Sequence, residues 1–557
     1  MKFNKVCLYL LMLLAVTSCK KYIDVTNPDT LTDPDFWKDE NSVRAYGWEF
    51  YSMFPGFGNS SSTNGDFYFT TFTDDQIPSG LTQYAQTTPA TNSDWSFGYV
   101  RKANIMLERI DGVAMSDEAK NHWKAIARFF RGLQYFRLVQ NFGDVPWYSH
   151  SMELADTDEM YKPRDPRKMV MDSVMDDINY AIANLRAADQ TNTIVKDVAF
   201  ALKSRICLYE GTYRKYHTEL GLTDADKWLT DAKSAAETLM NKSYTLGSNY
   251  QGIYNADNLA GNKEVILYKR YEPTYLMHST IAYLYSSTTI SGLSKSAVES
   301  YLCSDGKPIS ISPLYQGDNG LDKVLANRDR RLLLSIDTTY LYYLGHVKDG
   351  FTATTGYRIT KFLPDTNALK SAPTGINTNI TDAPLLYLSE IYLNYAEAAA
   401  ELDRTGAYTF TQADLDKTIN KLRARAGVAP MTLAGKQDPG FTDTKLDAQA
   451  NVTSLIWEIR RERRAELMMD GFRYQDLMRW KRGPYMDNKS NPDVFLGAKV
   501  PANPKVVINA QGYITPYSST SNRVFVDPKN YLSAVPTNQV LLYPPSMQAA
   551  MQNTGWK

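Results

Sequence analysis

The 557-residue sequence lacks the short motifs that mark the common cofactor and metal chemistries. It contains no HExxH, no CxxC pair, no GxxxxGKS/T and no GxGxxG after a predicted strand. These are the patterns of zinc peptidases, zinc or dithiol sites, phosphate loops and dinucleotide-binding folds. The five histidines are scattered at positions 122, 150, 217, 278 and 346, so they form no local metal cluster. We therefore predict neither a cofactor nor a metal ion.

An excess of charge of either sign is also absent, because Lys+Arg and Asp+Glu each number 61. A nucleic-acid-binding protein needs a basic surface for the phosphates, so we predict no nucleic-acid partner. Cysteine is scarce as well, and after residue 19 the chain has only Cys207 and Cys303. Two scattered cysteines cannot form a disulfide framework, although one bridge between them stays open in an oxidising compartment.

The longest apolar run lies at the amino terminus. Residues 6–16 follow Lys2 and Lys5, and they are too few to cross about 30 Å of hydrocarbon. The run leads into VTSC, which resembles a bacterial lipobox, so we predict a lipoprotein signal peptide over residues 1–18 and lipidation of Cys19. Acyl chains contribute ~0.8 kcal/mol per buried CH₂ and would hold the mature protein on a membrane. The alternative is plain secretion with an incidental cysteine.

Helical patterns fall in two blocks with an irregular part between them. They divide the mature chain into helical residues 19–240, a loop-rich part over 241–382 and helical residues 383–557. Short turns and small residues such as AEAAAEL (396–402) favour stacked helical hairpins of tetratricopeptide type, without a strict 34-residue period. The predicted helices span 41–54, 93–110, 117–141, 166–185, 195–216, 224–240, 389–403, 412–426 and 454–480.

The irregular stretches, 56–92 and 243–382, are rich in residues that favour loops and short strands. Loops raised from a rigid scaffold are where binding residues concentrate. The motif ERRAELMMDGFRYQDLMRW (462–480), in contrast, mixes charged and large apolar side chains at helical spacing. We predict interhelical ion pairs there rather than catalysts. The residues predicted to form these pairs are Glu462, Glu466, Arg473 and Asp476, whereas Asn104, Arg131 and Arg423 are predicted to satisfy buried backbone groups between hairpins.

Several blocks together resemble the SusD/RagB family of outer-membrane nutrient-binding lipoproteins. They run in order along nearly the whole chain from the lipobox, and their order and spacing are more specific than any one block. Tyr387 departs from the pattern, since the family often has Arg there, which weakens a scaffold ion pair. The blocks are DFWKDENSVRAYGWEFY (35–51), WSFGYVRKANIMLERI (95–110), AIARFFRGLQYFRLVQNFGDVPW (125–147), KSRICLYEG (203–211), YLSEIYLNYAEAAAEL (387–402), INKLRARAG (419–427), ERRAELMMDGFRYQDLMRW (462–480) and QNTGW (552–556).

The resemblance implies an all-α superhelix of four tetratricopeptide-like hairpins, decorated by irregular loops and short strands. It also implies a lipid-anchored protein that faces the exterior on the cell outer membrane, beside a SusC-like TonB-dependent barrel transporter. The protein would capture oligosaccharide, or in some relatives peptide, and deliver it to the barrel without enzymatic activity. Two other classes stay open: a glycan-degrading enzyme, for which Asp74 and Asp75 could supply a carboxylate, and an adaptor that binds only protein.

Carbohydrate receptors usually combine aromatic platforms with planar hydrogen-bonding side chains, and two irregular stretches have that mix. We predict that they converge on one exposed pocket, with Tyr84 and Tyr283 as stacking platforms and Asp75 and Arg270 as hydroxyl partners. The alternative is that most of these tyrosines pack loops onto the scaffold, and the next candidate is then the segment 340–357. The predicted ligand-binding residues are Asp74, Asp75, Gln83 and Tyr84 in the first stretch, beside Asp66, Tyr68 and Gln76, and Arg270, Tyr271 and Tyr283 in the second, beside Tyr275 and Tyr285.

Overall fold

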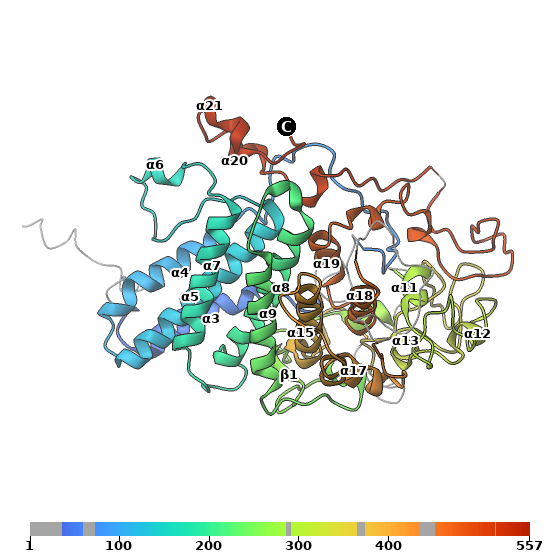
Figure 1. Cartoon of the computed structure of the whole chain (residues 1–557). Helices are drawn as coiled ribbons and strands as arrows, with labels where there is room; N and C mark the ends of the chain where they lie inside the picture. Colours follow the sequence, from blue (N-terminus) through green and yellow to red (C-terminus); the bar gives the residue numbers. More distant parts are fainter. Residues whose placement is uncertain (1–35, 59–72, 286–290, 365–373, 434–451, 519) are drawn as a thin grey trace, which may run out of the picture.

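The computed structural model describes the chain except for residues 1–35, 59–72, 286–290, 365–373, 434–451 and 519. In the described part helices dominate, as the sequence predicts (Figure 1). The tetratricopeptide-like count of four hairpins and the three-part division of the chain stay predictions. Cys19, Asp66 and Tyr68 lie outside the described residues, and no described helix has the length and apolarity needed to cross a membrane.

The first helical block forms one half of the molecule in Figure 1. The long helix α5 packs against α4 and α7, and α8 packs against α9, so sequence neighbours are also neighbours in space. Most predicted helices of this block are confirmed to within a few residues. Their bounds are α3 (Glu40–Trp48), α4 (Gly98–Arg109), α5 (Asp117–Phe142), α6 (Thr157–Met160), α7 (Arg167–Asn184), α8 (Lys196–Tyr216) and α9 (Ala225–Met240), with a 3₁₀ turn over Glu49–Met53 after α3.

Helix α5 shows how local sequence sets its two ends. The Ser116 side chain accepts a hydrogen bond from the backbone N–H of Ala119 at 3.1 Å, which caps the first turn. The helix stops at Gly143, whose φ of +72° suits glycine far better than a residue with a side chain. A Cβ there would also lie 2.9 Å from Leu532 Cδ1. The apolar residues predicted to share a face are all buried: Trp123, Ile126, Phe130, Leu133, Phe136 and Leu138.

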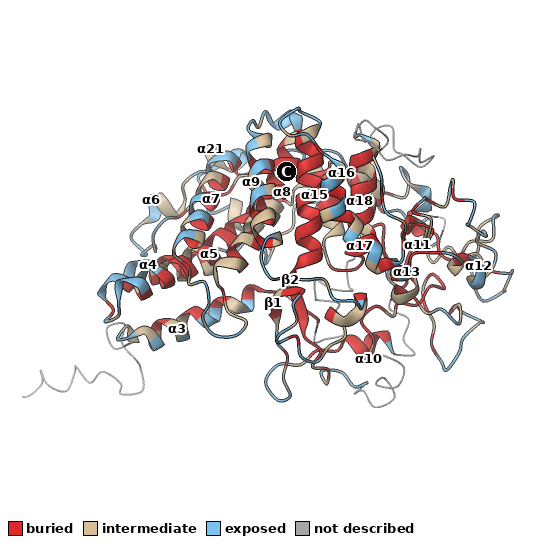
Figure 2. Cartoon of the chain, turned by 60° about the horizontal axis from the view of Figure 1, so that its bottom comes forward, coloured by how far each residue is buried: buried red, intermediate tan, exposed pale blue. Residues whose placement is uncertain are grey.

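The second block joins the first through α15, which packs against α8, α9 and α18. Every residue of α15 from Leu388 to Leu402 is buried, and its run of alanines allows neighbouring helices to approach closely. Figure 2 shows this helix as a nearly continuous buried element between the two halves. The bounds are α15 (Leu388–Asp403), α16 (Gln412–Lys417), α17 (Ile419–Ala426), α18 (Ser454–Glu466) and α19 (Arg473–Arg479), followed by the short α20 (Thr537–Val540) and α21 (Pro545–Gln548).

Two helices that the sequence predicts as continuous are broken in the structure. The prediction over 454–480 is wrong between α18 and α19, where Met469 has a φ of +66° and Gly471 a φ of +85°. This turn buries Asp470, which lies 2.6 Å from the Lys361 ammonium and accepts hydrogen bonds from the Tyr254 and Tyr387 hydroxyls. The prediction over 412–426 is likewise interrupted at Thr418, whose φ and ψ of −130° and −93° separate α16 from α17.

The middle part contains loops with short elements, including short helices that the sequence does not predict. Strand β1 (Val265–Lys269) pairs antiparallel with β2 (Ala383–Tyr387), which joins the beginning and end of this part beside α8. Cys207 and Cys303 are both buried free thiols, so the bridge left open by the sequence is absent. The short helices are α10 (Thr280–Leu284), α11 (Lys295–Ser300), α12 (Leu321–Leu325) and α13 (Arg330–Ser335).

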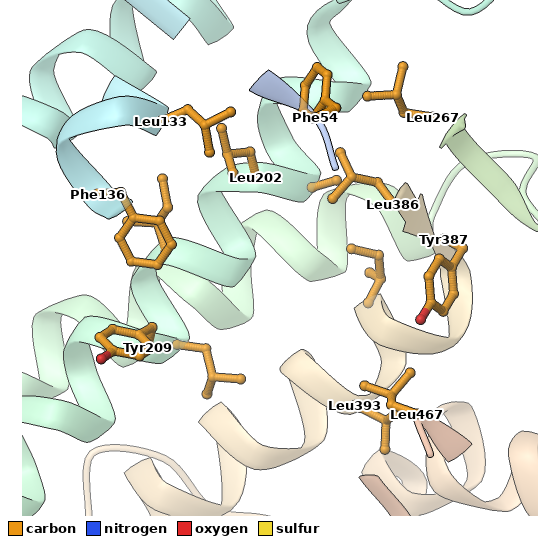
Figure 3. Close-up of a cluster of buried hydrophobic side chains, with 14 of the residues drawn as sticks. Phe54, Leu133, Phe136, Leu202, Tyr209, Leu267, Leu386, Tyr387, Leu393 and Leu467 are labelled. Atoms are coloured by element: carbon orange, nitrogen blue, oxygen red, sulfur yellow. The ribbon is translucent and has the colours of Figure 1, made fainter. Parts of the chain in front are cut away.

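One large apolar core connects the two helical blocks with the two strands. Figure 3 draws Phe136 and Leu202 from the first block, Leu386 of β2 and Leu393 of α15 within one cluster of buried apolar side chains. All four side chains are at most 4% exposed. Burying a side chain of this size contributes roughly 1.5–3 kcal/mol relative to leaving it in water, so this junction fixes the halves as one body.

Charged side chains are buried within the same scaffold, as the motif at 462–480 predicts. Arg331 lies 2.7 Å from both Glu462 and Glu466, and Arg423 lies 2.9 Å from Glu462. Arg463 lies 2.8 Å from Asp476. These ion pairs are internal, and they confirm a structural role for the motif.

Asn104 satisfies buried backbone groups as predicted, whereas Arg131 bonds mainly to side chains and reaches one backbone carbonyl, that of Ser149, at 3.3 Å. Asn104 Nδ2 donates to the carbonyls of Tyr148 and His150 at 3.0 and 2.9 Å. Arg131 donates to both carboxylate oxygens of Asp177 at 2.7 Å and to Asn104 at 2.8 Å. Glu390, beside the unusual Tyr387, pairs with Arg205 at 2.7 Å.

Candidate functional site

Asp74 and Asp75 occupy the interior instead of the exposed pocket that the sequence predicts. Each is 2% exposed. Asp74 accepts two hydrogen bonds from Arg473 at 2.7 and 2.8 Å, and Arg464 Nε donates to Asp75 at 2.7 Å. The predicted role of Asp75 as an exposed hydroxyl partner is therefore wrong, because its carboxylate is engaged within the fold.

The two neighbouring carboxyls titrate in opposite directions. Despite its burial, Asp74 has a pKa well below its usual range because the guanidinium groups of Arg464 and Arg473 face it. Burial raises the pKa of Asp75, and the negative charge of Asp74 adds to that effect. Asp74 thus carries the charge that the two arginines neutralise, and its role is to tie the 74–75 segment to α18 and α19.

The predicted stacking platforms are also buried, and they lie in different apolar clusters. Tyr84 is 7% exposed and packs with Trp480, Met486 and Phe525. Tyr283 is 8% exposed and belongs to the main core. Neither offers a ring face for stacking, so the predicted convergence on Tyr84 and Tyr283 is wrong. Tyrosine combines a large apolar ring with one polar hydroxyl group, so it packs well in a protein interior. Both tyrosines therefore match the alternative that the sequence left open, in which they pack loops onto the scaffold.

Tyr271 is buried too. Gln83 and Arg270 are exposed, and so are Tyr275 and Tyr285, which the sequence places beside them. Arg270 forms an ion pair with Glu272 two residues on. The two irregular stretches do lie side by side, since Gln76 forms a β-bridge with Leu293. Tyr271 also joins them, since its hydroxyl donates to the Phe57 carbonyl at 3.0 Å, but this tyrosine packs the two stretches together and offers no exposed ring. Gln83 and Arg270 remain candidates whose part in binding stays a prediction.

The substitution Tyr271→Phe tests whether the tyrosines of the two irregular stretches pack loops onto the scaffold. The Tyr271 hydroxyl donates to the Phe57 carbonyl at 3.0 Å, so its removal should lower the free energy of unfolding by about 0.5–1.5 kcal/mol. Affinity for a glycan should not change. Denaturant titration and calorimetry measure the two quantities, and Tyr275→Phe is the matched control because Tyr275 is 87% exposed. A weaker affinity without lost stability would restore Tyr271 to the binding site.

A partly exposed group of aromatic rings lies elsewhere in the middle part, on the hairpin-like segment 340–351. Lys348 and Phe351 form a β-bridge across Asp349 and Gly350, whose φ values of +54° and +77° are those of a type I′ turn. Asp-Gly is the preferred sequence for this turn, because both central residues need positive φ. The chain returns to pair Tyr342 with Gly356.

The rings of this segment stack on one another. The Tyr340 and His346 rings are parallel within 6°, with centroids 4.3 Å apart, and the Tyr343 ring also stacks on His346, with centroids 4.9 Å apart. Tyr285 contacts Phe351 with centroids 4.7 Å apart. We call Tyr285, Tyr340 and His346, the rings of this group that are exposed or half-buried, the aromatic surface. Tyr342 and Phe351 pack against these rings and are buried, at 4% and 9% exposed.

Arg358 and Asp337 supply fixed polar groups beside these rings. The Arg358 guanidinium lies over the Phe351 ring at 4.4 Å and donates to the Leu284 carbonyl at 2.9 Å. The Tyr342 hydroxyl donates to Asp337 at 2.9 Å. Although burial opposes it, hydrogen bonds led by those from Thr339 lower the pKa of Asp337 and keep it charged at neutral pH.

The exposure of Tyr285, Tyr340 and His346 distinguishes these rings from the buried Tyr84 and Tyr283, and Tyr285 is itself a tyrosine of the second predicted stretch. Tyr285 is 36% exposed, Tyr340 and His346 are half-buried, and the neighbouring Leu344 is 60% exposed. Half-exposed planar rings beside a fixed guanidinium can stack on the apolar C–H face of a sugar and bind its hydroxyls. The sequence signal for this group is the run YLYYLGH at 340–346. It lies inside segment 340–357, which the sequence offers as the next candidate for the binding site.

Groups suited to metal chemistry are absent from the described part of the chain, where no three His, Cys, Asp or Glu side chains gather. The fold is that of a loop-decorated helical scaffold. A sequence model of the SusD family matches residues 236–556, and one described as starch-binding associating with outer membrane matches residues 52–208. The chain belongs to the SusD family.

Curated relatives share low identity with the chain over partial lengths. A SusD-like protein of Bacteroides ovatus is 24% identical over 416 residues, which is 71% of this chain and 66% of the relative. The starch-binding protein SusD of Bacteroides thetaiotaomicron is 24% identical over 274 residues, or 44% and 46% of the two chains. The chain spans about half the length of two SusD-like proteins of Formosa agariphila, 45% and 51%.

Solved structures of similar fold cover almost the whole chain. A SusD-like carbohydrate-binding protein of Bacteroides fragilis superposes with a TM-score of 0.67 at 20% identity, covering 91% of this chain and 99% of that one. A laminarin-binding SusD-like protein superposes with a TM-score of 0.55 at 17% identity, covering 93% and 100%. At these identities the likeness establishes the fold alone.

Proposed function

We propose that this protein is a cell-surface lipoprotein that binds oligosaccharide on its aromatic surface and delivers it to a TonB-dependent outer-membrane transporter. The observation that carries the binding role is the half-buried Tyr340–His346 stack beside Arg358 and Asp337. The names of the relatives support it, because they include a starch-binding protein and a laminarin-binding protein. The protein acts without catalysis, since binding and release suffice for delivery.

A panel of glycans tests the binding role against the two alternatives. Purified mature protein is incubated with each glycan, and both retention and soluble products are measured. Retention without products is expected for a binding protein. Hydrolysis products would identify a glycan-degrading enzyme, and neither retention nor products would favour an adaptor that binds only protein.

Cys19→Ala tests the anchor. The substitution should leave the folded protein in the soluble fraction, because the acyl chains on Cys19 would be the hydrophobic anchor of the mature chain. Membrane fractionation and metabolic labelling with palmitate measure the outcome, and thermal unfolding of the released protein should match that of the delipidated native chain. Palmitate incorporation that persists in Cys19→Ala would contradict the anchor.

The transporter partner follows from the family and from the need of a captured ligand for a route across the membrane. Helical-repeat scaffolds often present broad protein-binding surfaces, which supports docking on a barrel. Affinity purification from native membranes should recover a TonB-dependent barrel of SusC type. Recovery of the monomer alone, in detergent that preserves such complexes, would count against delivery.

A further inference from the structure

A small cavity lies at the junction of the two helical blocks and has a volume of about 180 Å³. Helices α5 and α8 of the first block line one part of it, and β2, α19 and the turn before α19 line another. Pro55, Gln140 and Gln475 line the cavity and are half-buried, so one side of it lies near the surface of the molecule.

Most of the cavity wall is apolar. Figure 3 draws several of its side chains within one buried cluster, and there the Phe136 and Tyr209 rings meet edge to face with centroids 5.4 Å apart. Such a wall favours a ligand with an apolar face. The large apolar side chains that line the cavity include Phe129, Leu133, Phe136, Leu202, Leu208 and Phe472.

The volume of the cavity sets the size of the ligand. An engineered apolar cavity of about 150 Å³ binds benzene, whereas drug-sized ligands occupy pockets of roughly 300–1,000 Å³. A cavity of about 180 Å³ therefore has room for one six-membered ring with one small substituent.

The charged side chains that line the cavity already have partners within the fold. The Arg137 guanidinium donates to the Met53 carbonyl at 2.7 Å. Because no charge is left to balance, the cavity favours a neutral ligand. The ion pairs are Arg205 with Glu390 at 2.7 Å, Arg463 with Asp476 at 2.8 Å, Arg479 with Glu397 at 2.6 Å and Lys361 with Asp470 at 2.6 Å.

Two residues of the cavity wall carry a buried polar atom that has no hydrogen-bond partner in the described part of the chain. These atoms are the hydroxyl oxygen of Tyr209 on α8 and the side-chain carbonyl oxygen of Gln475 on α19. Tyr209 is only 4% exposed. Buried polar atoms without a partner destabilise a fold, and most of them are paired in native proteins. A ligand hydroxyl can pair with either atom, because it both donates and accepts.

We propose that this cavity binds a small neutral molecule that consists of one apolar ring and one hydroxyl group, of which phenol is the simplest case. The ring packs against the apolar wall, and the hydroxyl pairs with Tyr209 or Gln475. The inference does not depend on the proposed function, because the cavity shares no residue with the aromatic surface. The ligand contacts both helical blocks, so its binding should raise the melting temperature of the native chain.

Calorimetry on the mature chain tests this inference with two probes, phenol and toluene, which differ only in the hydroxyl group. Phenol should bind the native chain. The ratio of phenol affinity to toluene affinity should fall roughly fivefold in Tyr209→Phe or in Gln475→Met, since one hydrogen bond is lost. Tyr209→Phe should not lower the melting temperature of the free protein, because the Tyr209 hydroxyl has no partner among the described residues.

Tyr135→Phe is the matched control. Its buried hydroxyl lies outside the cavity, accepts from the Tyr148 N–H at 2.6 Å and donates to the Pro146 carbonyl at 3.3 Å. This variant should therefore melt at a lower temperature but keep the native ratio of probe affinities.

Three results would overturn the inference: binding of neither probe, binding of toluene without phenol, or an unchanged affinity ratio in both Tyr209→Phe and Gln475→Met. Tyr340→Ala should bind phenol with native affinity. A failure of glycan binding at the aromatic surface would therefore leave this site in place, and a failure of phenol binding would leave the proposed function in place.

Discussion

Replacing Asp74 with Asn is expected to lower the free energy of unfolding by about 3–5 kcal/mol at neutral pH, as breaking a buried ion pair does. The side chain is 2% exposed and accepts hydrogen bonds from Arg473, while Arg464 lies within 3.1 Å. Asn keeps the shape but leaves both guanidinium groups without their counter-charge. Affinity for a neutral glycan should stay unchanged, because the carboxylate is engaged within the fold.

The effect should depend on pH in a defined direction. The folded-state pKa of Asp74 is lowered from its ordinary value of 3.8, so the stabilisation is fully present above that pH. It is lost as the pH falls through the lower folded-state pKa. The difference in unfolding free energy between the native chain and Asp74→Asn should therefore shrink below about pH 4. Denaturant titrations at pH 7 and at several acidic values measure this difference.

Asp75→Asn is the matched control, since it makes the same chemical change one residue away. Burial raises the pKa of Asp75 and disfavours its charge, so its neutral replacement should cost less stability than that of Asp74. An equal loss of unfolding free energy in Asp74→Asn and Asp75→Asn would contradict the conclusion that Asp74 carries the charge and Asp75 does not. If Asp74→Asn kept normal stability but bound glycan more weakly, Asp74 would again be assigned to the ligand-binding site.

Local sequence predicted most helices because their ends and faces carry local signals. Ser116 and Gly143 mark the two ends of α5, and Trp123 to Leu138 mark its buried side. The break after α18 was missed because its cause is distant. Asp470 is drawn inward by Lys361, which lies 109 positions earlier, and the helical pattern around it gives no sign of that contact.

The candidate site was harder to predict for the same reason. In the sequence, Asp74 and Asp75 resemble solvated loop residues. In the fold they pair with Arg464 and Arg473, which lie about 390 positions later in the chain. Tyr84 and Tyr340 are alike in composition and in loop context. Only the packing of distant segments decides that Tyr84 meets Phe525 in an apolar cluster while Tyr340 stays half-exposed.

Tyr340→Ala is expected to weaken glycan binding by about 1–3 kcal/mol, or roughly 5- to 150-fold, by analogy with the loss of a base-stacking aromatic. Tyr340 stacks on His346 at 4.3 Å and is half-exposed, so its ring can take a sugar face. Its loss should cost little stability, because it packs against a small cluster apart from the main core. Calorimetry with the glycan selected from the panel measures the affinity.

Two controls make this result specific to stacking on the aromatic surface. Tyr340→Phe keeps the ring, so its glycan affinity should stay within about threefold of that of the native chain. The substitution removes only one hydroxyl hydrogen bond, which contributes about 0.5 kcal/mol. Tyr275→Ala removes an 87% exposed tyrosine from another loop and should bind normally. Native affinity in folded Tyr340→Ala would exclude the aromatic surface as the stacking site. The exposed Gln83 and Arg270 would then be the next residues to substitute, because they are the predicted ligand-binding residues that the fold leaves accessible.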